Sequence, residues 1–306
     1  MQNSFLSERT ANDIDCRVAK ILKDLDNPKP PLRLEDVRYL LQLDLKYYSS
    51  VDDGILQETL HRLTMSGKQL LNRPSLLIDA ISKFNLKALW QPDCKRILLD
   101  SALPNLKQRW AEAHEIGHSI LDWHEPMTHG DAQHTLSYSC HQQLEAEANF
   151  AAGRIVFLRD RFADELFSSS LSLASIKELS KNYGNTITSG LWRAVESLDI
   201  PAFAMVSQHP RNIQIENDSI RHFIRSPRFA NEFSTISAVS QFERLASFCR
   251  KGRGNIGQSE LVLTDDNGDE HIFLIECFFN YYDTLTLATR LKKHETVIAV
   301  SNKYIL

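Results

Sequence analysis

Cysteine is scarce in this chain of 306 residues. Its five cysteines are scattered and never form a Cys-x-x-Cys pair; they are Cys16, Cys94, Cys140, Cys249 and Cys277. An odd, dispersed set argues against a disulfide framework and against a cysteine-ligated zinc ribbon. Isolated thiols suit a reducing compartment, so we expect a cytoplasmic protein.

Long hydrophobic runs are also missing. Residues 1–17 lack the apolar core of a signal peptide. The most apolar later stretch, residues 272–291, is interrupted by Glu276, Asn280 and Asp283. Such a stretch suits two buried strands better than a membrane span, so we expect no membrane partner.

Charge of one sign is not in large excess, because the formal net charge is -4. This small negative net charge does not attract the protein as a whole to nucleic acid or to an anionic membrane. Basic residues gather only locally, at 221–228 and 250–253. We interpret these groups as solvated surface. The alternative is that they bind an acidic ligand or partner.

The sequence also has no repeats or low-complexity tracts, so we place domain boundaries where the pattern of predicted helices and strands changes. Its length suits more than one domain. We expect an α+β protein in three parts: a mainly helical domain with a small sheet over residues 1–160, a helix-turn-helix-like segment over 161–200, and an antiparallel α+β domain over 201–306.

The first part contains most of the predicted helices. Residues 1–30 are polar and end in Asn-Pro-Lys-Pro-Pro, which predicts a loop. Residues 32–48 predict a helix followed by a strand, and residues 87–103 predict two strands around a Pro-Asp turn. Further helices are predicted at 53–65, 73–84, 105–124 and 141–162.

The remainder reads as a helix pair between residues 171 and 198, followed by strands. Residues 265–268, Asp-Asp-Asn-Gly, are a strong hairpin signal. The predicted strands are 201–208, 258–265, 271–279, 283–290 and 296–302.

Residues 114–118 read His-Glu-Ile-Gly-His, an H-E-x-x-H motif in the predicted helix 105–124. Residues four apart share one helix face, so His114 and His118 can bind one metal ion from the same side. Glu115 can take a proton from an attacking water, which makes the motif typical of zinc peptidases. Gly117 costs about 1 kcal/mol of helix stability relative to alanine, which a close approach by another backbone would explain.

A catalytic zinc needs a third protein ligand and an open position. The helix predicted at 141–162 offers Glu145 and Glu147, which point about 200° apart, so only one can face the metal. We favour Glu145 because Asn149 lies one turn further on the same face, where its amide can orient a ligand histidine. Glu147 is the alternative.

Residues 111–124 and 144–157, AEAHEIGHSILDWH and LEAEANFAAGRIVF, together resemble the ImmA/IrrE family of metallopeptidases. The resemblance covers about residues 33–157. It implies a thermolysin-like fold core and a zinc site, and substrates that are helix-turn-helix repressors of the XRE type in stress response or mobile-element control. It also implies, for the longer IrrE-like members, a helix-turn-helix-like segment and a GAF-like carboxy-terminal domain, which would act as a sensor with a small-molecule ligand or as a docking module.

Other signals are weaker. His124, His129, His134, His141 and Tyr138 are candidates to stabilise an oxyanion, although we interpret each one as a solvated side chain. Residues 252–257 match Gly-x-Gly-x-x-Gly, but a helix precedes them and a strand follows, the reverse of a dinucleotide site. In the helix pair only Arg193 offers a strong contact to DNA, so we interpret the pair mainly as a packing or partner-docking element.

Two functions remain open from the sequence. The first is a zinc endopeptidase in which His114, His118 and Glu145 bind Zn²⁺ and Glu115 is the general base. The alternative is a transcriptional regulator that acts by binding alone and carries a non-catalytic metal site.

Overall fold

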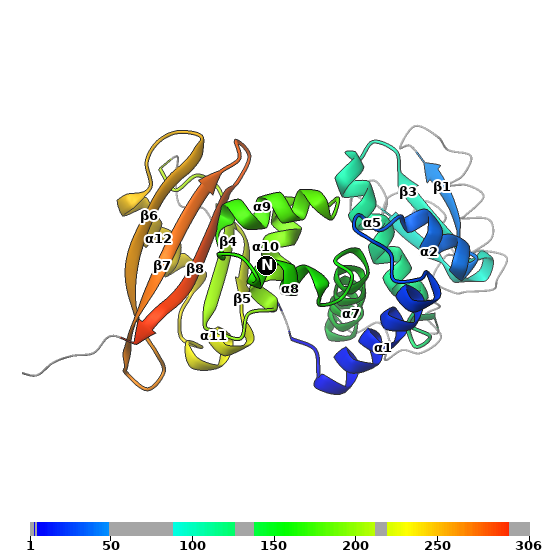
Figure 1. Ribbon diagram of the computed structural model, residues 1–306, viewed down its shortest axis with the longest axis horizontal. Helices are drawn as coiled ribbons and strands as arrows, with labels where there is room; N and C mark the ends of the chain where they lie inside the picture. Colours follow the sequence, from blue (N-terminus) through cyan, green and yellow to red (C-terminus); the bar gives the residue numbers. More distant parts are fainter. Residues whose placement is uncertain (1–2, 4, 49–87, 126–137, 212–218, 294–306) are drawn as a thin grey trace, which may run out of the picture. The chain divides into compact units, whose positions relative to one another are not determined.

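The computed structural model describes residues 3, 5–48, 88–125, 138–211 and 219–293 (Figure 1). The helices predicted at 53–65 and 73–84 and the strand predicted at 296–302 lie outside these residues. The fold is α+β, as predicted. It forms two compact units: residues 4–168 with 177–190, here the HExxH unit, and residues 1–3 and 169–176 with 191–306, here the five-stranded unit. The three-part division stays a prediction.

The HExxH unit contains a three-stranded mixed sheet in the order β1-β3-β2. Strand β1 (Asp44–Tyr48) runs parallel to β3 (Arg96–Asp100), and β2 (Ala88–Gln91) is antiparallel to β3. The single turn η2 (Pro92–Cys94) joins β2 to β3 at the predicted Pro-Asp position. The helix predicted before β1 is α2 (Leu34–Leu41).

The prediction of a loop over residues 1–30 is wrong, because helix α1 spans Glu8–Asp24. Its buried residues Ile14, Val18, Ile21 and Leu22 recur at helical spacing within a polar segment. Ser7 caps the helix by accepting a hydrogen bond from the backbone N–H of Thr10. This sparse stripe is enough to bury one side of the helix.

Helices α5 (Asn105–Ser119) and α7 (Tyr138–Val156) carry the two motifs. Leu106, in the first turn of α5, is 46% exposed. Helix α7 ends earlier than predicted because Leu158 and Arg159 adopt left-handed conformations, with φ of 54° and 61°. A separate helix, α8 (Arg161–Phe167), follows.

Gly117 is where α5 and α7 come closest. A Cβ atom at Gly117 would lie 2.7 Å from the carbonyl oxygen of Ala148 and 3.3 Å from the Cβ of Ala151. The close backbone approach proposed from the sequence is therefore present, and it sets the spacing between the two helices that carry the motifs.

The predicted helix pair is also present, as α9 (Leu173–Asn182) and α10 (Ile187–Glu196). The boundary between the two units falls within each of these helices. In the HExxH unit, a Cβ atom at Gly190 would collide with the side chain of Ser180, so these residues pack tightly. Arg193 is 8% exposed and offers no free surface to DNA, in agreement with a packing role.

The five-stranded unit is an antiparallel sheet in the order β5-β4-β8-β7-β6 (Figure 1). Its strands are β4 (Ala202–Ser207), β5 (Ile220–Arg225), β6 (Gly254–Thr264), β7 (Glu270–Phe279) and β8 (Thr284–Lys293). Residues 265–268 form the predicted hairpin turn between β6 and β7. The apolar stretch 272–291 forms most of β7 and β8, as predicted.

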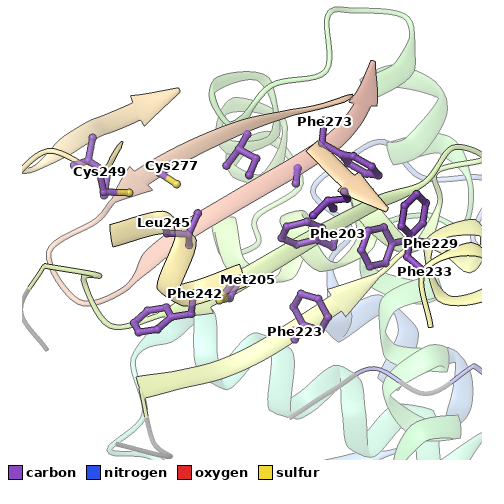
Figure 2. Packing of buried hydrophobic residues seen from close by; sticks show 14 residues of the cluster. Phe203, Met205, Phe223, Phe229, Phe233, Phe242, Leu245, Cys249, Phe273 and Cys277 are labelled. Atoms are coloured by element: carbon purple, nitrogen blue, oxygen red, sulfur yellow. The ribbon is translucent and has the colours of Figure 1, made fainter. Parts of the chain in front are cut away.

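A buried aromatic core holds this sheet against α11 (Pro227–Glu232) and α12 (Ala238–Phe248) (Figure 2). Phe203 of β4, Phe229 of α11 and Phe273 of β7 are all fully buried, and the Phe203 and Phe229 rings lie 5.2 Å apart. The five-stranded unit therefore has a hydrophobic core of its own.

Candidate metal centre

His114 and His118 project from the same side of α5, one turn apart. Their Nε2 atoms face each other at 3.2 Å, and their side chains are 15% and 14% exposed. Helix α5 thus presents two imidazole nitrogens towards one point, as the four-residue spacing predicts.

Glu145 of α7 completes a triangle with the two histidines. Its Oε2 lies 3.2 Å from Nε2 of His114, and its Oε1 lies 3.6 Å from Nε2 of His118. Metal–ligand distances of about 2.0–2.1 Å at tetrahedral angles place ligand atoms about 3.3 Å apart, so these separations suit one tetrahedral ion. Within the described part of the chain, this is the group of three side chains that could hold a metal ion.

Glu145 supplies the negative charge of this triangle. Burial raises the pKa of Glu145, but the hydrogen bonds and charges of His114 and His118 outweigh it and hold the pKa well below its ordinary value. The Glu145 side chain is 42% exposed, so water can reach its carboxylate. A catalytic ion must likewise be within reach of substrate or water.

Asn149 lies one turn after Glu145 on α7, as the sequence predicts. Its Oδ1 is 3.0 Å from Nδ1 of His114, on the side of the ring opposite the triangle. A neutral imidazole that donates to this amide oxygen keeps Nε2 free as a ligand atom.

Glu147 points away from the triangle and is 2% exposed. Its Oε2 accepts hydrogen bonds from Nε1 of Trp123 at 2.6 Å and from Nε2 of His124 at 2.9 Å, and its Oε1 accepts from Nε2 of Gln143 at 2.9 Å. The two glutamates therefore face different partners, as their angular offset predicts.

Glu115 is buried, with 7% of its surface exposed. Burial raises its pKa, an effect opposed by the positive charges of His114 and His118 and by a hydrogen bond from the backbone N–H of Trp90 in β2. The carboxylate next to the first histidine is thus shielded from bulk water.

The interpretation of His124 as a solvated side chain is wrong, because it is fully buried. Its Nδ1 lies 2.8 Å from Nδ1 of His118. The sequence signal was present, since His124 follows the motif by six residues, but only the turn after α5 brings it back to the metal centre. His129 and His134, and the side chains of Tyr138 and His141, lie outside the described residues.

The remaining sequence signals agree with their plainer interpretations. Residues 252–253 precede β6 and residues 254–257 form its first residues, so a helix comes before the glycine pattern and a strand follows it, the reverse of a dinucleotide site. The exposed side chains of Arg221 and Arg228 pair with Asp283 at 3.1 Å and with Asp199 at 3.0 Å.

Comparison with known proteins gives a likeness of fold. Neither the known protein families nor the curated proteins match this chain. Among solved structures, a Mycobacterium tuberculosis transcriptional regulator is similar, with a TM-score of 0.53 and 12% sequence identity over 93% of this chain and 90% of that chain. In the described residues, no helix is both long and apolar enough to cross a membrane. The site and fold together define an α+β protein with a His-His-Glu centre suited to a metal ion.

Proposed function

We propose that this protein is a zinc-dependent endopeptidase of the ImmA/IrrE type. The observation that carries the proposal is the triangle of ligand atoms from His114, His118 and Glu145, with the buried carboxylate of Glu115 beside it in sequence. A set of two histidines and one glutamate is typical of catalytic zinc, although other first-row metals bind such ligands.

Each residue of the centre has a role in this proposal. His114, His118 and Glu145 would hold the zinc ion, which supplies Lewis acidity for hydrolysis near neutral pH. Glu115 accepts a proton from the attacking water at its carboxylate and returns it to the leaving amine.

The proposed substrate is a specific cytoplasmic protein, a helix-turn-helix repressor of the XRE type. This part of the proposal rests on the family resemblance, and the likeness to a fold found in a transcriptional regulator agrees with a role in gene control. The five-stranded unit would then sense a small molecule or dock the substrate.

The test compares wild-type protein with Glu115→Gln, after zinc loading and desalting, on a purified XRE-type repressor encoded nearby. Glu115→Gln should keep about one zinc per chain but slow repressor cleavage by about 100-fold or more, because the general base is lost. Glu145→Ala should lose both the zinc and the cleavage. Cleavage by Glu115→Gln at the wild-type rate would overturn the mechanism.

The alternative function, a regulator that acts by binding alone, is favoured by the structural neighbour, which is a transcriptional regulator. It predicts that the protein shifts promoter DNA in an electrophoretic assay at a fixed, specified salt concentration, and that it does not cleave the repressor. Among the described residues three side chains form the centre and Glu145 is 42% exposed, which favours the peptidase because structural zinc sites are closed by four protein ligands.

A further inference from the structure

In the described part of the chain, a buried relay of two side chains, His124 and Glu147, stands behind the ligand histidine His118. Glu147 accepts from His124 at 2.9 Å, and His124 contacts Nδ1 of His118 at 2.8 Å. Among the described residues, Nδ1 of His114 instead contacts the side-chain amide of Asn149, an exposed residue. The metal centre is therefore supported unequally on its two sides.

The hydrogen-bond partners determine where the protons lie in this relay. Trp Nε1 can only donate a hydrogen bond, and an ionised carboxylate can only accept one. Nε2 of His124 therefore carries a proton and donates a hydrogen bond to Glu147. In a neutral imidazole the other nitrogen is an acceptor, so Nδ1 of His124 accepts from Nδ1 of His118. Nε2 of His118 is then left with a free lone pair that points at Nε2 of His114 and at Glu145.

The opposite proton arrangement is incompatible with metal binding. If His124 donated from Nδ1, His118 would carry its proton on Nε2, in the middle of the ligand triangle. Glu147 opposes this arrangement because it secures the proton on Nε2 of His124.

The turn after α5 is built to hold His124 in place. The backbone N–H of His124 donates to the carbonyl of Leu121 at 2.8 Å. From α1, Arg17 donates to the carbonyl of Ile120 at 2.9 Å, and its guanidinium lies 5.1 Å from the centre of the Trp123 ring. The relay is thus fixed by three elements: α1, the turn after α5, and α7.

We propose that Glu147 and His124 are positioning residues that hold His118 as its Nδ1–H tautomer and so present Nε2 to the metal. This inference rests on the proposed metal site but not on any peptide substrate. Partners of this kind typically change metal affinity by 10- to 100-fold.

The experiment measures zinc dissociation constants by competition with a chromophoric chelator, and records the visible absorption of the cobalt-loaded protein. His124→Phe removes the acceptor and should weaken zinc binding by about 10- to 100-fold and alter the cobalt spectrum. His124→Asn, whose amide oxygen can replace Nδ1, should recover most of the affinity. Glu147→Gln keeps the shape but removes the charge, and should weaken binding by a smaller factor.

The matched control is His271→Phe. His271 is also buried and pairs with a carboxylate, Asp265, at 3.0 Å, but it belongs to the five-stranded unit. It should leave the zinc affinity and the cobalt spectrum unchanged, even if it lowers stability.

The outcomes separate this inference from the proposed function. Wild-type affinity and spectrum in both His124→Phe and Glu147→Gln would overturn the relay and leave the peptidase proposal standing. If His124→Phe does not fold, Glu147→Gln decides alone. A wild-type protein that binds neither zinc nor cobalt would overturn the proposed function and the relay with it.

Discussion

Asp15 in α1 joins two arginines at the end of α7. Nε of Arg154 donates to it at 2.5 Å and Nε of Arg159 at 3.0 Å, while Asp160 also pairs with Arg154. Burial raises the pKa of Asp15, but the hydrogen bonds and charges of Arg159 and Arg154 outweigh it and lower the pKa below its ordinary value. The ionised form therefore stabilises the folded HExxH unit.

Asp15→Asn should lower the free energy of unfolding at pH 7 by about 2 kcal/mol, because Asp160 still neutralises Arg154 in part. A lowered folded-state pKa contributes stability that is complete above the unfolded value of about 3.9 and is lost as pH falls through the folded value. The difference between wild type and Asp15→Asn should thus be constant from pH 7 to about pH 5 and shrink below about pH 4.

Urea unfolding followed by tryptophan fluorescence measures this difference at each pH. Asp24→Asn, at the exposed end of the same helix, is the control and should change stability by less than about 0.5 kcal/mol. A difference for Asp15→Asn that stays equal at pH 7 and pH 3.5 would contradict the role of the carboxylate.

At the residue scale, the sequence predicts the residues of the candidate metal centre better than the residues that support them. His114, Glu115 and His118 follow from spacing, and Glu145 and Asn149 follow from one helical turn. Glu147 was weighed only as a ligand, because its partners Trp123 and His124 lie beyond a turn that periodicity does not describe. Side chains within one helix are predictable from its period, whereas contacts across a turn depend on tertiary packing.

At the element scale, Gly117 controls the distance between α5 and α7. Gly117→Ala should cost about 1–3 kcal/mol of stability, even though alanine favours a helix by about 1 kcal/mol, because its Cβ collides with the carbonyl oxygen of Ala148. It should also weaken zinc binding, because helices forced apart separate Glu145 from the two histidines.

Gly153→Ala on α7 is the matched control. No atom lies within 4 Å of the added Cβ there, so this variant should gain about 0.5–1 kcal/mol and keep its zinc affinity. Thermal unfolding and chelator competition measure both effects. An unchanged or higher stability of Gly117→Ala would show that the close approach is not required.

The predictions of helices failed where the average composition of a segment does not reveal which of its residues are buried or where its backbone turns. Helix α1 was missed because four apolar residues among polar neighbours are enough to cover a small face. The end of α7 was missed because Leu158 and Arg159 are unusual residues for a left-handed conformation, where glycine or asparagine is the ordinary signal. The strands β7 and β8 were predicted well because their apolar run is bounded by clear turn residues.

At the scale of the whole molecule, two units with separate cores should unfold in two calorimetric transitions. Zinc at 100 times its dissociation constant should stabilise the HExxH unit by about 2.7 kcal/mol and raise only its transition, by several degrees. Trp90, Trp110 and Trp123 belong to this unit and report its transition by fluorescence.

Glu145→Ala is the control for the calorimetric experiment. It should show both transitions and no shift with zinc. If the wild-type protein unfolds in a single transition that zinc shifts to higher temperature, the units are thermodynamically coupled and the prediction of independent unfolding is wrong.

The path of the chain between the units affects how such a protein can evolve. The chain passes from one unit to the other after residues 3, 168, 176 and 190. A recombination event that exchanges one internal stretch, such as residues 4–168, leaves residues 177–190 of the same unit behind and joins them to a foreign core. The two units are therefore expected to be inherited together and to diversify by point substitution, so a new specificity in one unit arises within a lineage that already carries the other.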